Sequence, residues 1–176
     1  MQPSHPLIVL RYCPKCGSPG FKADTERSLK CSDCGFILFI NSAAAVAALI
    51  SDDSNKLLLT TRGIEPDYGK LDLPGGFINP GESAEDAVKR ELNEELGLEV
   101  KSMQYLGSLP NEYIFNGLSI FTLDLVFRVV PYTLTNLKPM DDITDFNFFS
   151  ENDIDYSQIS APSIKSFVQQ FFHRKT

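Results

Sequence analysis

The stretch that decides how this chain folds is Gly76-Phe-Ile-Asn-Pro-Gly-Glu-Ser-Ala-Glu-Asp-Ala-Val-Lys-Arg-Glu-Leu-Asn-Glu-Glu-Leu-Gly-Leu98. Its first part is a loop, because the Pro80-Gly81 pair interrupts regular structure. Ser83 is a typical helix N-cap, and Gly97 is suited to the left-handed conformation that ends many helices. The pattern therefore predicts a helix from about Ala84 to Leu96.

Three glutamates of this helix occupy unfavourable positions. On a helical wheel Glu91 and Glu95 fall in the middle of the apolar face, and Glu94 falls at its edge. Their spacing makes them repel one another, and Glu94 and Glu95 lie near the negative end of the helix dipole. The apolar face itself is formed by Ala84, Ala87, Val88, Leu92 and Leu96.

A divalent cation would relieve these unfavourable interactions, because hard cations bind clustered carboxylate oxygens. The alternative is an ordinary acidic helix face that is neutralised by lysine and arginine. Only Lys89 and Arg90 are available within the helix, and the wheel places both away from the Glu91 and Glu95 face. The wheel therefore favours a metal site.

The same stretch resembles a complete Nudix box. Gly76, Glu82 and the run Arg90-Glu91-Leu92-Asn93-Glu94-Glu95-Leu96-Gly97-Leu98 fill every fixed position of that pattern, and Leu73-Pro74-Gly75-Gly76-Phe77 before it is also typical. The resemblance implies an α+β Nudix fold, in which a mixed sheet is sandwiched between helices. It also implies a pyrophosphohydrolase that cleaves the diphosphate of a nucleotide with Mg²⁺ or Mn²⁺.

The resemblance also implies roles for individual residues. Glu91 and Glu95 would hold the metal, and Glu94 would be a further ligand or the group that deprotonates water. The metal would also take the Gly75 carbonyl and one carboxylate beyond the box, Asp141 or Asp142. Local structure would depend on Gly76, Gly97 and a Glu82–Arg90 ion pair.

Several side chains are candidates for contacts with phosphate or base. They flank the expected metal cleft or follow the box: Arg62, Tyr68, Lys70, Tyr113 and Phe115. Each of the first three is equally well explained as an ordinary surface residue.

All four cysteines of the chain lie in two Cys-x-x-Cys pairs, Cys13/Cys16 and Cys31/Cys34. This spacing is typical of a structural zinc site with four thiolate ligands. The alternatives are disulfide bonds or a rubredoxin-like iron site. Because so short a segment cannot bury a sufficient core, we expect metal to stabilise a zinc ribbon over residues 1–40. The Nudix domain would then comprise residues 41–176.

The rest of the chain alternates between strand-like runs and turns. We expect strands at 43–51 and 56–62, paired antiparallel, and further strands at 99–109, 119–130 and 146–149. Residues 110–117 are rich in turn formers, and a hairpin is expected between the two cysteine pairs. A last helix should begin near Ala161.

Composition limits the partners and the location. The net charge of -7 is uneven, because residues 1–40 carry +2 and the remainder carries -9. An acidic body makes nucleic acid an unexpected partner. The longest apolar run, Ala43 to Ile50, is too short to cross a membrane, and the first residues lack a signal-peptide pattern. We therefore expect a cytoplasmic protein, with a homodimer as one possibility.

A zinc ribbon before a Nudix domain resembles the NADH pyrophosphatase group, which also removes NAD caps from RNA. That group carries Ser-Gln-Pro-Trp-Pro-Phe-Pro after its box, whereas this chain has Ser108-Leu109-Pro110-Asn111-Glu112-Tyr113-Ile114 and no tryptophan. We therefore expect a nucleoside diphosphate linked to a small moiety, such as ADP-ribose or a nucleotide sugar, to be preferred over NADH. The rival from another class is a non-catalytic nucleotide sensor, although such domains usually lack box carboxylates.

Overall fold

The computed structural model describes residues 1–173 and divides the chain into two compact units. The first comprises residues 1–42 and 112–121, and the second comprises residues 43–111 and those from 122 onward. The predicted domain boundaries placed residues 112–121 in the larger domain. They group with the smaller unit because the Ser119 N–H donates to the Ser4 carbonyl at 2.8 Å and the Phe121 ring contacts His5.

The first unit is a small three-stranded antiparallel sheet with one short helix. The helix α1 spans Pro6–Val9, and the strands are β1 (Phe21–Thr25), β2 (Ser28–Cys31) and β3 (Ile37–Phe39), in the order β1-β2-β3. The hairpin expected between the cysteine pairs is therefore present as β1 and β2. Its small core contains Leu7, Phe21 and Leu29 together with two of the cysteines, Cys13 and Cys31.

The second unit contains two three-stranded sheets. One has the order β4-β8-β7, and the other has the order β6-β5-β9. Their bounds are β4 (Ala43–Leu49), β5 (Leu57–Arg62), β6 (Leu71–Asp72), β7 (Val100–Phe115), β8 (Leu118–Pro131) and β9 (Ile143–Phe149). The helical elements are α2 (Ala84–Leu96), η1 (Glu151–Asp153), η2 (Tyr156–Gln158) and α3 (Pro162–His173).

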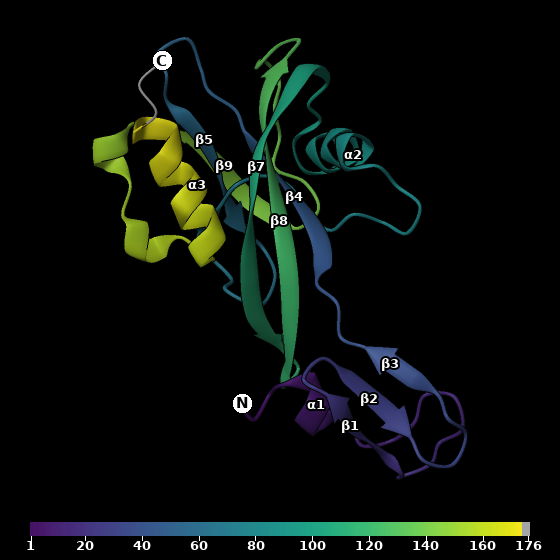
Figure 1. Cartoon of the computed structure of the whole chain (residues 1–176). Coiled ribbons are helices and arrows are strands. Elements are labelled where there is room, and N and C mark those ends of the chain that lie inside the picture. Colours follow the sequence, from purple (N-terminus) through teal and green to yellow (C-terminus); the bar gives the residue numbers. More distant parts are fainter. Residues whose placement is uncertain (174–176) are drawn as a thin grey trace. The chain divides into compact units, whose positions relative to one another are not determined.

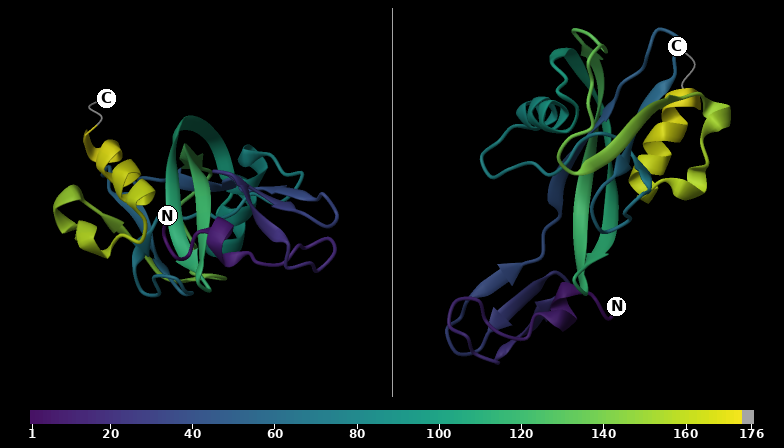
Figure 2. Two further views of the ribbon diagram at one scale, coloured as in Figure 1. Left: turned by 60° about the horizontal axis from the view of Figure 1, so that its bottom comes forward. Right: turned by 180° about the vertical axis from the view of Figure 1, so that it is seen from behind.

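Strand β4 is buried on both faces, which explains its continuous apolar sequence. Val46 and Ala48 belong to the core beneath α2, whereas Ala47 and Leu49 belong to the core beneath α3. Figures 1 and 2 show α2 and α3 on opposite sides of the strands. The predicted class, α+β with a mixed sheet sandwiched between helices, is confirmed.

The predicted antiparallel pairing of residues 43–51 with 56–62 is wrong. Strand β4 pairs in parallel with β8, while β5 pairs antiparallel with β6 and β9. The two segments share an isolated bridge, Ser51 to Leu57. A short turn between two apolar runs favours a hairpin locally, but β4 and β5 belong to different sheets, and their partners β8 and β9 come from distant sequence.

The expected turn-rich segment at 110–117 is strand for most of its length. Strand β7 continues to Phe115, and the reversal is made by Asn116 and Gly117, which both have positive φ. An Asn-Gly pair is well suited to a two-residue hairpin turn. Pro110 is tolerated because β7 lies at the edge of its sheet. No helix within residues 1–173 is long and apolar enough to span a membrane.

Candidate active site and cysteine cluster

The helix α2 has the ends that the sequence predicts. The Ser83 hydroxyl accepts a hydrogen bond from the Asp86 N–H at 3.1 Å, which caps the first turn. At the other end Gly97 has φ 65° and its N–H bonds to the Asn93 carbonyl. These caps fix the register of the helix, and therefore the direction in which each glutamate projects.

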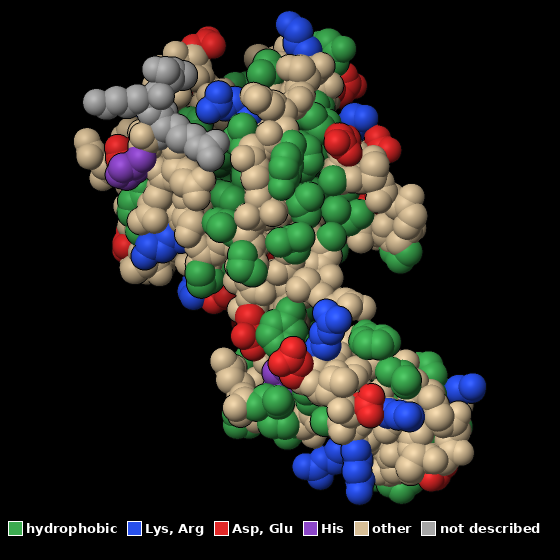
Figure 3. Space-filling model, in the orientation of Figure 1, with side chains coloured by type: hydrophobic (Ala, Val, Ile, Leu, Met, Phe, Trp, Pro, Cys, Tyr) green, Lys and Arg blue, Asp and Glu red, His purple; other side chains and the backbone are tan. Residues whose placement is uncertain are grey.

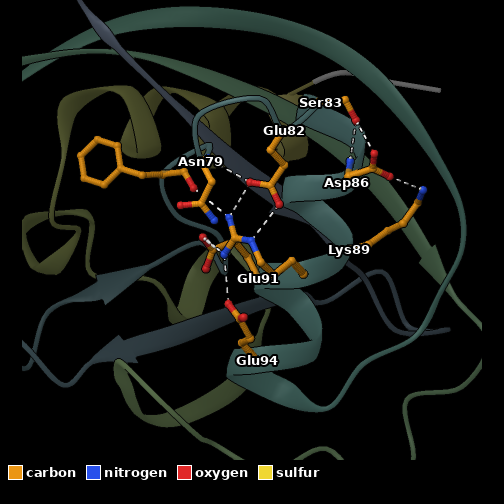
Figure 4. A network of polar contacts seen from close by, with 9 residues as sticks. Asn79, Glu82, Ser83, Asp86, Lys89, Glu91 and Glu94 are labelled. Carbon is orange, nitrogen blue, oxygen red and sulfur yellow. Dashed lines mark hydrogen bonds and ion pairs between the residues drawn. The ribbon is translucent and has the colours of Figure 1, made fainter.

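Arg90 is the centre of a polar network that joins the preceding loop to α2 (Figure 4). Its Nε and Nη2 donate to the two carboxylate oxygens of Glu82 at 2.8 and 2.9 Å. Nη2 also donates to the Phe77 carbonyl, while Nη1 donates to Glu91 at 2.7 Å and to Glu94 at 3.0 Å. Hydrogen bonds from Arg90 hold the pKa of the Glu82 carboxyl below its usual range.

The helical wheel was wrong in separating Arg90 from the glutamate face. A wheel records only where each Cα lies, whereas an arginine side chain can reach residues one turn away. Glu91 and Glu94 therefore each have a cationic partner. The expected Glu82–Arg90 ion pair is present, but it belongs to a larger network than the sequence suggested.

Glu95 is the most deeply buried of the three glutamates. Its residue is only 6% exposed, and its carboxylate accepts a hydrogen bond from the Gly75 N–H at 3.0 Å. Burial, together with the nearby charges of Glu91, Asp72 and Asp142, raises the pKa of Glu95 to about 8, against the lowering effect of the Gly75 N–H. Such a shift means that the ionised carboxylate lacks sufficient positive partners.

The ionised form of Glu91 is disfavoured by its surroundings in a similar way. Burial raises the pKa of the Glu91 carboxyl, Arg90 lowers it, and the charges of Glu94 and Asp141 raise it again. Glu94 has a side chain that is 44% exposed. Figure 3 shows acidic side chains over α2 with basic ones among them. The arrangement is an acidic site with a deficit of positive charge, which suits a divalent cation.

The two glycines before the loop allow close approach of backbone and carboxylate. A Cβ on Gly75 would lie 2.1 Å from the Val46 carbonyl oxygen, and one on Gly76 would lie 2.6 Å from a Glu91 oxygen. The carbonyls of Pro74 and Gly76 accept hydrogen bonds from β4, whereas the Gly75 N–H is directed to Glu95. The Gly75 N–H is therefore not part of the hydrogen bonding between this segment and β4.

Asp72 is a partly buried acid that the sequence pattern does not mark as a site residue. It bonds to Arg62 at 2.8 Å and to the Ser160 hydroxyl at 2.9 Å. Burial raises the pKa of the Asp72 carboxyl, against the lowering effect of Arg62. No sequence signal marks it, because a polar residue between Leu71 and Leu73 indicates a solvent-facing position of an ordinary strand.

The side chains that were predicted to contact phosphate or base lie in different surroundings. Arg62 is directed to Asp72 and to the Pro66 carbonyl, and Lys70 pairs with Asp67 at 2.6 Å. Tyr68 is 62% exposed. The aromatic candidates Tyr113 and Phe115 belong to the first compact unit, in the end of β7.

The four cysteines form a compact cluster in the first unit. Their sulfur atoms all lie within 4.8 Å of one another, and all four are free thiols. The closest pairs, Cys13 with Cys34 and Cys16 with Cys31, are 3.7 Å apart, which is too long for a disulfide bond. Within residues 1–173, no other group of three or more such side chains is gathered in this way.

The two turns that carry the cysteines have the same construction. The Gly17 N–H donates to the Cys13 carbonyl, and the Gly35 N–H donates to the Cys31 carbonyl. Both glycines have positive φ, a conformation that glycine adopts more readily than other residues. The backbone N–H of Cys34 lowers the pKa of the Cys31 thiol to about 6. The geometry of the four sulfur atoms suits a metal that binds thiolates.

Comparison with known proteins gives the following likenesses. The NUDIX domain family model matches residues 41–171. The NAD-capped RNA hydrolase NudC of Vibrio atlanticus is 27% identical over 150 residues, which cover 85% of this chain and 52% of that protein. This chain therefore spans about half the length of that curated relative.

Two solved structures show the fold. The NUDIX hydrolase from Nitrosomonas europaea has a TM-score of 0.66 at 22% identity. The match covers 93% of this chain and 92% of that chain. The NUDIX domain of Shewanella oneidensis NrtR, complexed with ADP ribose, has a TM-score of 0.64 at 22% identity. The match covers 78% of this chain and 91% of that chain.

The raised pKa of Glu95 predicts a pH-dependent effect on stability. The folded state binds the proton of the Glu95 carboxyl more tightly than the unfolded state does. Protonation of Glu95 therefore contributes its full stabilisation below about pH 4.5, and this stabilisation is lost as the pH rises through about 8. Without added divalent metal, Glu95→Gln should therefore melt several degrees above wild type at pH 9, because each kcal/mol of stability raises the melting temperature by about 2–4 °C. The difference should shrink near pH 5.

The matched control is Glu85→Gln, since Glu85 is an exposed residue of the same helix. It should change the melting temperature little and equally at both pH values. Equal melting temperatures of Glu95→Gln and wild type at pH 9 would contradict the burial argument.

Proposed function

Because the chain belongs to the NUDIX domain family, we propose that it is a pyrophosphohydrolase that cleaves the diphosphate of a nucleotide. The observation that carries the proposal is the buried carboxylate of Glu95, which the Gly75 N–H holds in place on a complete box helix. A purely structural acid would not need to be buried among other acids. A sensor that only binds nucleotides would not need it either.

The proposed metal ligands are Glu91, Glu95 and Glu94, with the Gly75 carbonyl and Asp142. The donor set fits Mg²⁺ or Mn²⁺, because all of these groups offer oxygen and no cation lowers the pKa of the buried Glu95 carboxylate. When bound, such an ion polarises the diphosphate and makes a bound water more acidic.

Individual residues of the chain have separate roles in the proposed reaction. The Gly75 N–H fixes the buried carboxylate of Glu95, so that its position does not depend on the substrate. Arg90 fixes Glu91 and ties it to the loop through Glu82. Glu94 is the most solvent-accessible of the three glutamates, which suits a group that accepts the proton of an attacking water or completes the ligand set. The products would be a nucleoside monophosphate and a second phosphate ester.

Paired substitutions separate catalysis from local structure. Glu95→Gln should reduce turnover by more than the roughly 10–100-fold that is typical for residues that merely orient metal ligands, and it should weaken Mn²⁺ binding. Glu82→Gln should retain more activity but lower the melting temperature, because it removes the paired hydrogen bonds to Arg90. Steady-state kinetics, Mn²⁺ titration and thermal melting test this. Full activity of Glu95→Gln would refute the assignment.

For the cysteine cluster we propose one structural zinc ion on Cys13, Cys16, Cys31 and Cys34. A site with four thiolates has no open position for a substrate, so its role is to stabilise the small unit. Metal analysis should give about one zinc per chain. Cys31→Ser should lose it, whereas Lys15→Ala, an exposed change in the same turn, should retain it. Iron in place of zinc, or full zinc in Cys31→Ser, would contradict the proposal.

Two substrate classes compete. The name of the Vibrio atlanticus relative favours NAD-capped RNA and, by extension, NADH. The segment Ser108 to Ile114 favours a smaller substrate, because it lacks the proline-rich aromatic motif of that group and forms regular strand. The ADP ribose bound by the NrtR domain is one such smaller ligand. We propose ADP-ribose or a nucleotide sugar ahead of NADH; a cytoplasmic location and a homodimer stay predictions.

The order of substrates is measured as kcat/KM for NADH, ADP-ribose, a nucleotide sugar and a nucleoside triphosphate under one metal condition. We expect ADP-ribose or the nucleotide sugar to exceed NADH. A tenfold preference for NADH, about 1.4 kcal/mol in transition-state binding, would show that the altered segment does not decide specificity.

A further inference from the structure

A cavity of about 140 Å³ lies within the first compact unit, apart from the box residues in sequence. Four segments that are distant in sequence form it: the N-cap of α1, the β1–β2 turn, the segment after β3 and the start of β8 beyond the hairpin turn. For comparison, an engineered apolar cavity of ~150 Å³ binds a benzene ring. The space therefore suits one ring system rather than a whole dinucleotide.

Three of the residues that line the cavity are aromatic or apolar. The rings of His5 and Phe121 have centroids 5.5 Å apart at an angle of 56°, and Ile40 is also part of the lining. The Nδ1 atom of His5 accepts the Leu7 N–H at 3.2 Å, so Nε2 is the nitrogen that can donate to a ligand. These residues can stack on a planar ring and offer it a hydrogen bond.

The lining also includes three polar residues, Glu26, Arg27 and Asn41. Within residues 1–173 the side chains of these three residues form no hydrogen bond or ion pair with one another or with other side chains. The guanidinium of Arg27 can stack on a ring, while the Asn41 amide and the Glu26 carboxylate can bond to a ring edge that carries both donors and acceptors. One cation beside one anion does not suit a simple phosphate site.

The walls are held in place by backbone bonds. The Ile40 N–H donates to the Arg27 carbonyl at 2.8 Å, which joins the segment after β3 to the β1–β2 turn. Ser4 and Ser119 are joined by two contacts, one through the backbone and one between their hydroxyls at 2.8 Å. These bonds position His5 against Phe121 without any ligand, so the cavity is largely preformed.

From these features we propose that the cavity binds a nucleobase, as a subsite carried by the first unit. The inference rests on the proposed function, in which the substrate is a nucleotide and therefore brings an aromatic ring with donors and acceptors. Bases are held in proteins by stacking on aromatic rings and arginine, with hydrogen bonds to their edges. The base can come from a free mononucleotide or from a single-stranded RNA, which share this chemistry.

The test uses the full zinc-bound chain without added Mg²⁺ or Mn²⁺, followed by backbone amide NMR. AMP should shift the amide signals of residues 5, 27, 41 and 121, whereas ribose 5-phosphate, which has no base, should not. Arg27→Ala should weaken the AMP affinity read from those signals by at least about fivefold, because the stacking cation is lost. Lys22→Ala, an exposed cation on β1 outside the cavity, should leave it unchanged.

A single-stranded oligoribonucleotide of five residues identifies the source of the base. Tighter binding than AMP assigns the subsite to RNA, and equal binding assigns it to free nucleotides. Phe121→Ala should also weaken binding; retained zinc and an unchanged melting temperature would show that this variant folds. Shifts that are absent, that ribose 5-phosphate reproduces, or that survive Arg27→Ala unchanged would overturn the proposal.

Hydrolysis of ADP-ribose with Mg²⁺, measured on the same protein, separates this inference from the proposed function. Hydrolysis without base-dependent shifts would overturn the subsite alone. Base-dependent shifts without hydrolysis of any nucleotide would overturn the proposed reaction and leave a nucleobase-binding unit.

Discussion

The hydrogen bonds of Arg90 are the interaction on which the site most depends. A guanidinium has five N–H donors, and those of Arg90 reach Glu82, Glu91, Glu94 and the Phe77 carbonyl. The loop before α2 contains breakers and has little regular structure of its own. Its attachment to the helix through one planar cation therefore sets the distance between the backbone near Gly75 and the carboxylates of α2.

The same network explains how so many acids can share one helix. Arg90 compensates Glu91 and Glu94, but Glu95 receives only the Gly75 N–H and remains among Asp72 and Asp142. The folded chain is therefore prepared for one more positive charge at a defined place. In the proposed function a divalent ion provides that charge, and the stability lost through burial of Glu95 is regained when the ion binds.

The core fixes where this helix lies. Strands β4 and β5 are buried on both faces, so that one set of their side chains packs under α2 and the alternate set packs under α3. The Val46 carbonyl lies so close to Gly75 that no side chain fits there. Packing of β4 thus determines how near the Gly75 peptide comes to Glu95, and it links the core directly to the candidate site.

The sequence by itself determined the local features. The helix from Ala84 to Leu96, its caps, the clustered glutamates and the paired cysteines all follow from spacing and residue type, which act over a few residues. The tertiary structure alone sets the pairing of β4 with β8, the ion pair of Asp72 with Arg62, and the grouping of residues 112–121 with the first unit. These depend on contacts between segments far apart in the chain, where periodicity gives the face of a strand but not its partner.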